Sequence, residues 1–460
     1  MIYEFLMLSI TLLAGVSLAA VTGIRQLPLL IPAGVLFAVV LRTASFSLLN
    51  LFDVLSINIT VWFLLTLLMI VYAVIRGKLF IQLKALALIV PIVLVSVVIT
   101  RVERWSSPVY GDPSWILTMS EMMQSGVDME TLNGRVSIKR GFAFPLMLSL
   151  GPTGEYLSAF PAVLFISLIF ASYWAITRFT SRHNLALLLA LAVMLTTPIV
   201  IRSSLYLNGH VLMALAVVIG LAVGLEAANE KTLSSQRLIL LMVSLSVIST
   251  TRAEGIAVAA LVALTVISAN WISRKQIMLT VSSATFSFGI WLSVYNSYIL
   301  NSTGIYWVLF VLILVGLGLL VAAKPLDPIR FRLIPLAIIA ELVVLVAALV
   351  IFREDLLGGV QAQFENLVLG EGLWGIVIIA MPILLGYLYF QKDQKRLASM
   401  VFILMLGNVI LKMVDGGQFG EPTLGRVGWA DSLNRMWLHL TGVFAMVIAI
   451  SFSSKPKINS

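Results

Sequence analysis

The stretch Arg104–Gly126, RWSSPVYGDPSWILTMSEMMQSG, is the first long polar interruption after a mostly apolar N-terminal region. Asp112 stands where this loop should turn into a helix, because Gly111 loosens the backbone before it and Pro113 suits a first helical turn. The glycine that closes the stretch offers a stop. Several apolar side chains can share one helix face: Trp115, Ile116, Met119, Met122 and Met123. This pattern predicts a short amphipathic helix in a membrane interface, which would hold the Asp112 carboxylate at the headgroup level.

The rest of the chain is too apolar for a soluble domain. Hydrophobic residues make up 60% of the 460 residues, charged residues make up 11%, and the mean hydropathy is +1.06. This composition predicts an all-α, polytopic membrane protein. The net charge of +9 does not indicate a nucleic-acid partner, because the basic residues stand singly between apolar runs. The absence of cysteine excludes disulfide and thiolate chemistry.

About fifteen apolar runs are long enough to cross the hydrocarbon core of a bilayer, which is about 30 Å thick. The first run is expected to be a transmembrane helix and not a cleaved signal peptide, because it carries Glu4 and lacks a basic segment before it. The expected transmembrane helices lie near residues 4–23, 28–41, 55–75, 82–100, 157–177, 184–201, 208–228, 236–250, 254–272, 276–298, 304–323, 331–352, 372–390, 397–413 and 434–452.

Lysine and arginine are distributed unevenly between alternate turns of these helices. If Lys455 and Lys457 are cytoplasmic, 18 basic residues fall in cytoplasmic turns, while the short outer turns hold only Arg42, Arg202, Arg252 and Arg353. This split agrees with the positive-inside rule and places the N-terminus outside. Most acidic residues also fall on the outer side, although they contribute little to topology. We therefore expect the chemistry on the extracytoplasmic face of a plasma or inner membrane.

Several catalytic signatures are absent from the sequence. It contains no Walker-type phosphate loop, no His/Cys cluster with zinc spacing and no G-x-S-x-G nucleophile elbow. No internal repeat is visible either. Gly220 and Gly224 form a GxxxG pair, which indicates close helix packing. No metal site is therefore predicted, and the sequence leaves open whether a divalent metal assists the reaction.

The polar turn Thr250–Gly255, TTRAEG, lies between two short apolar runs, so Arg252 and Glu254 should sit at or just below the outer interface. Charged side chains at this depth are costly unless they are paired or face a wet cavity. The turn is therefore a candidate site. A structural ion pair between neighbouring helices is the alternative.

The last outer loop, Asp415–Asn434, is rich in glycine and runs into the final apolar segment. Asp431, Arg435 and His439 recur at i, i+4 and i+8, so one continuous helix would carry them on one stripe. A fixed guanidinium such as Arg435 can hold a phosphate beside a membrane cavity, and Lys412 could help. The alternatives are a helical salt bridge for the stripe and a snorkelling end for Lys412.

Three isolated features complete the set of candidates. The basic run with Lys139 and Arg140 could dock on anionic lipid headgroups or simply snorkel towards them. His210 is a lone imidazole at the outer start of an apolar run, and a hydrogen-bonded structural histidine is the favoured interpretation. Glu341 lies in the middle of another run, where a neutral or hydrogen-bonded carboxyl is expected.

Three motifs together resemble the C-type (GT-C) integral membrane glycosyltransferases, which include the protein O-mannosyltransferases and the aminoarabinose transferases of lipid A. The motifs are the GDPSW-like loop at Asp112, the RPEG-like turn at Arg252 and the stretch ADSLNRM at 430–436. The resemblance covers roughly residues 82–298 and the last motif. Ala253 departs from it, because proline is common at that position, and the module begins only at the fourth apolar run.

The resemblance implies a division of the chain and a set of roles. Residues 1–81 would form extra N-terminal transmembrane helices. Residues 82–298 would form the GT-C-like catalytic module, with interfacial helices in the outer loop 101–156, and residues 299–460 would form the C-terminal helices with outer loops 353–371 and 414–433. The implied roles are Asp112 as catalytic base; Arg435, Arg252 and Lys412 at the donor phosphate; Glu254, Asp431, His210, Trp115 and Tyr110 along the site; and Lys139 and Arg140 at lipid headgroups.

The expected activity is the inverting transfer of a sugar from a polyprenyl-phosphate donor to a hydroxyl group of a glycan, lipid or protein acceptor. No nucleotide sugar is needed on the extracytoplasmic face. A flippase or secondary transporter for a lipid-linked sugar or small solute is one alternative, and it would place charges along a path through the membrane. An enzyme of the O-antigen ligase or polymerase type is another, and it would need a large outer loop late in the chain.

Overall fold

The computed structural model describes most of the expected helices but leaves parts of the chain undescribed. The expected helix at 304–323 lies outside the described residues, and those at 276–298 and 331–352 are described only in part, so the count of fifteen stays a prediction. The described residues are 2–52, 54–102, 112–126, 141, 143–151, 158–180, 183–205, 207, 209–230, 232–252, 254–269, 271–272, 276–277, 279–287, 289, 329–330, 338–339, 341–343, 346, 353–391, 394–414 and 431–453.

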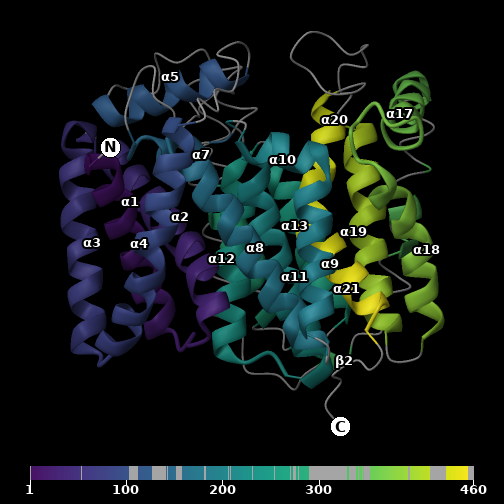
Figure 1. Cartoon of the computed structure of the whole chain (residues 1–460), viewed down its shortest axis with the longest axis horizontal. Helices are drawn as coiled ribbons and strands as arrows, with labels where there is room; N and C mark the ends of the chain where they lie inside the picture. The colour runs from purple at the N-terminus through teal and green to yellow at the C-terminus, as the bar shows by residue number, and fades with distance from the viewer. Residues whose placement is uncertain are drawn as a thin grey trace.

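These residues confirm the prediction of an all-helical protein (Figure 1). The exception among them is one antiparallel pairing of two residues, in which Trp271 lies opposite Arg330. The elements are α1 Ile2–Val21, α2 Leu27–Leu51, η1 Leu55–Ile57, α3 Asn58–Ile75, α4 Leu79–Val102, α5 Asp112–Ser125, α7 Ala143–Leu148, α8 Phe160–Phe179, α9 His183–Thr196, α10 Pro198–Leu205, α11 His210–Glu230, α12 Ser235–Thr251, α13 Gly255–Ala269, β1 Trp271–Ile272, β2 Ile329–Arg330, α17 Arg353–Leu367, α18 Ile376–Phe390, α19 Lys395–Val414, α20 Asp431–Met436, η3 Trp437–Leu440 and α21 Thr441–Ser451.

Six stretches in the described part of the chain are long and apolar enough to cross a membrane. They are α1, α2, η1 with α3, α4, α8 and α11. The helices α12, α13 and α18 are also apolar but shorter. This is the architecture of a helical bundle built for a bilayer, as the composition predicts.

The expected span at 184–201 is not one straight helix. It is divided into α9 and α10, whose axes are bent by 75° at Thr197. Pro198 begins α10, and a proline at this point cannot donate the backbone hydrogen bond that would continue α9. The break turns α10 across the end of the bundle.

Helix α11 forms the centre of the bundle and is almost fully buried. It packs against α8, α12, α13 and α21. The predicted packing role of the GxxxG pair is confirmed: a Cβ atom at Gly224 would lie 2.6 Å from the Val266 side chain of α13, and one at Gly220 would lie 3.4 Å from Val262. Glycine at these positions lets α11 and α13 approach closely.

The first four helices pack on one another around α1, which contacts α2, α3 and α4. The apolar side chains along the outer faces of α3 and α4 are exposed, which suits contact with lipid. One topological assignment in this region is wrong: Arg42 is not in an outer turn. Helix α2 continues to Leu51, so Arg42 lies inside the helix and is fully buried.

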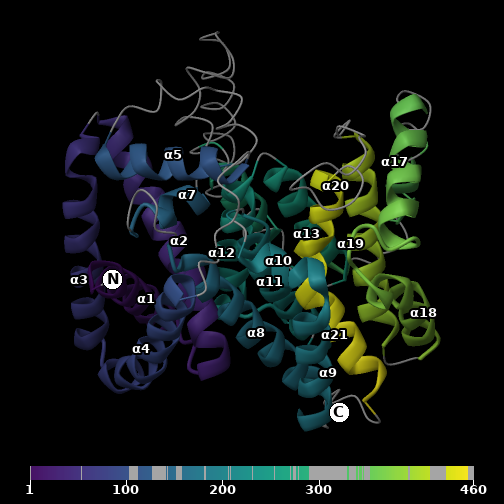
Figure 2. The ribbon, with the colours of Figure 1, turned by 45° about the horizontal axis from the view of Figure 1, so that its top comes forward.

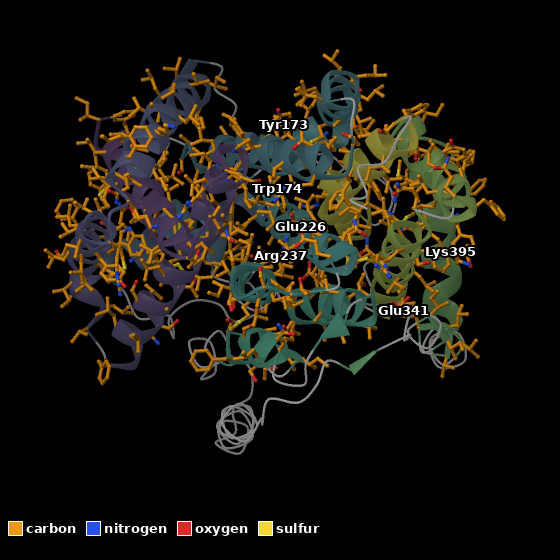
Figure 3. The ribbon with its side chains drawn as sticks, turned by 90° about the horizontal axis from the view of Figure 1, so that it is seen from below. Tyr173, Trp174, Glu226, Arg237, Glu341 and Lys395 are labelled. Carbon is orange, nitrogen blue, oxygen red and sulfur yellow. The ribbon has the colours of Figure 1, made fainter. Side chains whose placement is uncertain are left out.

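The helices place two sets of polar residues at opposite ends of the bundle. The N-terminus, α5, α10, α17 and α20 lie at one end, whereas β2 and the C-terminus lie at the other (Figure 1). At the second end Glu226 forms ion pairs with Arg178 and Arg237, at 2.8 and 3.1 Å, as seen from that side in Figure 3. The first end, which we call the α5 end, carries the site described next.

Candidate functional site

The turn between α12 and α13 contributes a buried ion pair to the α5 end. Arg252 is only 5% exposed, and its Nε atom donates a hydrogen bond to Oε1 of Glu254. Gly255 starts α13 directly afterwards, and a side chain there would collide with the carbonyl oxygen of Ile248. A structural ion pair between neighbouring helices is the alternative to a site at this turn, and the pair observed here lies within one turn and does not join two helices.

Two glycines bring other segments onto this turn. Gly141 has a φ angle of +63°, and a Cβ atom there would lie 2.4 Å from the carbonyl carbon of Thr251. A Cβ atom at Gly209 would lie 2.5 Å from the Thr251 side chain. The end of the first long loop and the start of α11 therefore both pack against the backbone and side chains around Arg252.

The start of α11 brings His210 against His439 from the last part of the chain. Nδ1 of His210 lies 2.8 Å from Nε2 of His439, and the two rings are stacked with centroids 5.0 Å apart. Both side chains are buried. His210 also interacts electrostatically with Arg252 and Arg435. The favoured interpretation of His210 as a hydrogen-bonded histidine is confirmed, and its partner comes from 229 positions along the chain.

Arg435 is buried near this pair, but not through the predicted helical stripe. The final segment is α-helical only to Met436, continues as the 3₁₀ helix η3 and resumes as α21. The change of helix type between Arg435 and His439 removes the simple i, i+4 relation that the sequence suggested. Asp431 begins α20, and its side chain lies outside the described residues.

A side-chain network holds α20 in place. Asn434 accepts a hydrogen bond from Nε1 of Trp374 at 2.7 Å and donates one to the carbonyl oxygen of Gly372 at 3.1 Å. Nε1 of Trp437 donates to Gln363 in α17 at 2.8 Å. These bonds tie the residues on both sides of Arg435 to α17 and to the segment between α17 and α18.

Helix α5 begins at Asp112, as predicted, and lies across the end of the bundle (Figure 2). Its buried face includes Ile116, Met119 and Met123. Trp115 is 40% exposed, so it does not share the face of α5 that packs on the protein, and its expected contact with the membrane interface stays a prediction. The helix packs against α7, and α7 in turn packs against α12, the helix that Arg252 directly follows.

Several candidates lie wholly or partly outside the described residues. Tyr110, Lys139 and Arg140 belong to loop segments that are not described. Asp112 and Lys412 are placed only as members of α5 and α19, without their side chains. The side chains that the structure brings together are therefore Arg252, Glu254, His210, Arg435 and His439.

An apolar groove of about 590 Å³ lies between α18 and α19. Trp437, two residues after Arg435, forms part of its wall. The sequence did not suggest this groove, because it depends on how α18 and α19 pack against each other and against Trp437 of the last segment. It is lined by Ile338, Pro382, Leu385, Gly386, Tyr389, Ala398, Ser399, Phe402, Met405, Leu406, Val409 and Trp437.

The described residues contain no group of three or more His, Asp or Glu side chains that could hold a metal ion. In comparisons with known proteins, no family description, curated protein or solved structure matches this chain.

Proposed function

We propose that this protein is a membrane glycosyltransferase that moves a sugar from a polyprenyl-phosphate donor to an acceptor hydroxyl group, with a GT-C-like arrangement of about fifteen transmembrane helices. The observation that carries the proposal is the buried cluster of Arg252, Arg435, His210 and His439. These four residues come from three distant segments, and the cluster contains two buried guanidinium groups, of which Arg252 is paired with Glu254. Guanidinium groups bind phosphate through several directed hydrogen bonds, so the cluster suits a phosphate-containing ligand.

The groove beside Trp437 supports a lipid as the carrier of that anion. A donor with a phosphate between a sugar and a long isoprenoid chain needs cationic groups and an apolar channel next to each other. Arg435 and the wall residue Trp437 are separated by only one residue, so the two requirements meet in one short segment. A soluble sugar phosphate would need the cations but not the groove.

The proposed reaction is a single displacement. The acceptor hydroxyl gives its proton to the Asp112 carboxylate while its oxygen forms a bond to the anomeric carbon. The bond between that carbon and the phosphate oxygen breaks, and the polyprenyl phosphate leaves with the electron pair. Arg435 and Arg252 would stabilise the negative charge that develops on the leaving phosphate. The attack from the opposite face inverts the anomeric centre.

The test is transfer of labelled sugar in proteoliposomes that contain the full-length protein and a polyprenyl-phosphate sugar. Formation of a labelled glycoside and free polyprenyl phosphate in equal amounts would support the proposal. If folded protein releases neither product with any of several donors and hydroxyl acceptors, that result would argue against the proposal.

A second candidate is a flippase or transporter for a lipid-linked sugar, and the break between α9 and α10 favours it. Broken helices occur where transporters bind substrates within the membrane. In the same vesicles, a fluorescent lipid-linked sugar would become accessible to an added quencher without chemical change. Movement without glycoside formation would favour this candidate.

A further inference from the structure

The buried Arg42 guanidinium in α2 lies in a second polar network, whose side chains differ from those of the proposed donor site. Its Nη1 atom donates to Oδ1 of Asn58 at 2.5 Å, and its Nη2 atom lies 3.4 Å from Oγ of Ser149. Its Cζ atom is 5.3 Å from the centre of the Trp62 ring. Within the described part of the chain, no carboxylate forms an ion pair with Arg42. Neutral oxygen atoms and an aromatic ring therefore compensate its charge.

Asn58 connects Arg42 to α5. Its Nδ2 atom donates to the carbonyl oxygen of Met123 at 2.9 Å. The chemistry of the two partners determines the orientation of the Asn58 amide, because a guanidinium can only donate and a carbonyl oxygen can only accept. With the amide oxygen held by Arg42, the amide nitrogen must face Met123. The hydrogen bond from Arg42 thus fixes the Asn58 side chain with its amide nitrogen towards α5.

Two other contacts hold the same end of α5. Gln124 donates from Nε2 to the carbonyl oxygen of Gly151 at 3.2 Å. Gly126 has a φ angle of +70°, and a Cβ atom there would lie 2.6 Å from the carbonyl oxygen of Leu55. The C-terminal end of α5 is therefore attached to η1, α3 and the turn after α7, while the helix begins at Asp112.

We infer that Arg42 is a positioning residue: through the Asn58 amide it holds α5 against the bundle, and so sets the place of the helix that starts at Asp112. The effect of this positioning on catalysis rests on the proposed function. The attachment of α5 to the bundle through Asn58 does not depend on that function. Arg42, which is buried in α2, would then fix the position of α5 without a direct hydrogen bond to it.

The substitution Asn58→Asp separates this role from simple stabilisation of the bundle. Aspartate would keep an acceptor for Arg42 and add a charge that matches it, but its carboxylate cannot donate to the Met123 carbonyl. If Arg42 and Asn58 serve only the local packing, Asn58→Asp should leave α5 unchanged. If they position α5, the helix should loosen although the ion pair is strengthened.

Hydrogen–deuterium exchange of the full-length protein in nanodiscs measures this directly. We expect amides of α5 to exchange about tenfold faster in Asn58→Asp and in Arg42→Met, the size expected for the loss of one buried hydrogen bond. Exchange in α11 should be unchanged. Ser149→Ala is the control, because it removes the long 3.4 Å contact with Arg42 and a hydrogen bond to the Leu146 carbonyl within the same turn, but leaves Asn58 in place. It should leave α5 exchange near that of the wild type.

Unchanged exchange in α5 for both Asn58→Asp and Arg42→Met, with the wild-type melting temperature, would overturn the inference. Loss of exchange protection throughout the bundle would also overturn it, because that result would assign Arg42 to general stability.

Transfer activity gives an independent result. Faster α5 exchange with unchanged kcat and KM would support the positioning of α5 but contradict the catalytic role of Asp112. Faster exchange with a lower kcat and an unchanged donor KM would support both.

Discussion

Nδ1 of His210 and Nε2 of His439 lie 2.8 Å apart and join the first residue of the central helix α11 to the 3₁₀ helix η3. In this contact one ring donates and the other accepts. The electrostatic interaction of His210 with Arg252 and Arg435 makes the pair part of a larger buried polar cluster. The last segment of the chain is thereby connected to the core of the bundle at the α5 end.

Replacing His439 should weaken this connection. We expect His439→Ala to lower the free energy of unfolding by about 1–3 kcal/mol, because it leaves a buried nitrogen of His210 without its hydrogen bond and opens a cavity. Thermal unfolding in detergent measures the change. His439→Gln can still form a hydrogen bond and should lose less. Equal stability of the wild type and His439→Ala would mean that the histidine pair contributes nothing to the fold.

Arg435→Ala should weaken binding of the lipid-linked donor more than binding of the acceptor. We expect the donor KM to rise at least tenfold, since a hydrogen bond to a charged group contributes about 1.5–3 kcal/mol. The acceptor KM should change little. Arg202→Ala is the control, because Arg202 is an exposed cation of α10 at the same end. An unchanged donor KM in Arg435→Ala would reassign Arg435 to structure.

Asp112→Asn should give a protein that inserts and folds but transfers sugar at least a hundredfold more slowly, in line with the usual contribution of a general base. Initial rates at saturating donor and acceptor measure this effect. Glu121→Gln changes another carboxylate of α5 and should keep most of the activity. Transfer at the wild-type rate by Asp112→Asn would leave Asp112 only the role of starting α5.

Gly386 lines the apolar groove, and no heavy atom lies within 4 Å of a Cβ atom added there. Gly386→Leu should therefore fill part of the groove without a clash. We expect the KM for a donor with a long isoprenoid chain to rise several-fold, whereas Gly386→Ala should have a small effect. Donors with progressively shorter chains should lose this difference. If the long-chain donor has the same KM with Gly386→Leu, its chain binds elsewhere.

Gly141→Ala should be more damaging than Gly77→Ala, although both glycines have positive φ angles. A side chain at Gly141 would collide with Thr251, whereas nothing lies within 4 Å of a Cβ atom at Gly77. We expect Gly77→Ala to lower the free energy of unfolding by about 1 kcal/mol, through backbone strain alone. Gly141→Ala should lower it by more than about 2 kcal/mol, because a collision adds to the strain. Similar melting temperatures for the two variants would contradict the close packing at Thr251.

Local features of the site could be predicted from the sequence. The start of α5 at Asp112 follows from the Gly-Asp-Pro order, and the polar turn with Arg252 and Glu254 follows from the break between two apolar runs. Each depends on a few neighbouring residues and on the high energy of an unpaired buried charge. The packing of Gly220 and Gly224 was predictable for the same reason, since close helix contact favours residues without large side chains.

Features that depend on distant segments could not be predicted. The composition determined that the chain is all-helical and mostly apolar, and the residues around Asp112 determined where α5 begins. Only the tertiary structure decided that His210 meets His439, that Arg42 is enclosed and that a groove opens between α18 and α19. The physical reason is that lipid-facing and core-facing surfaces are equally apolar in a membrane helix, so the pattern of one segment does not indicate which other segment covers it.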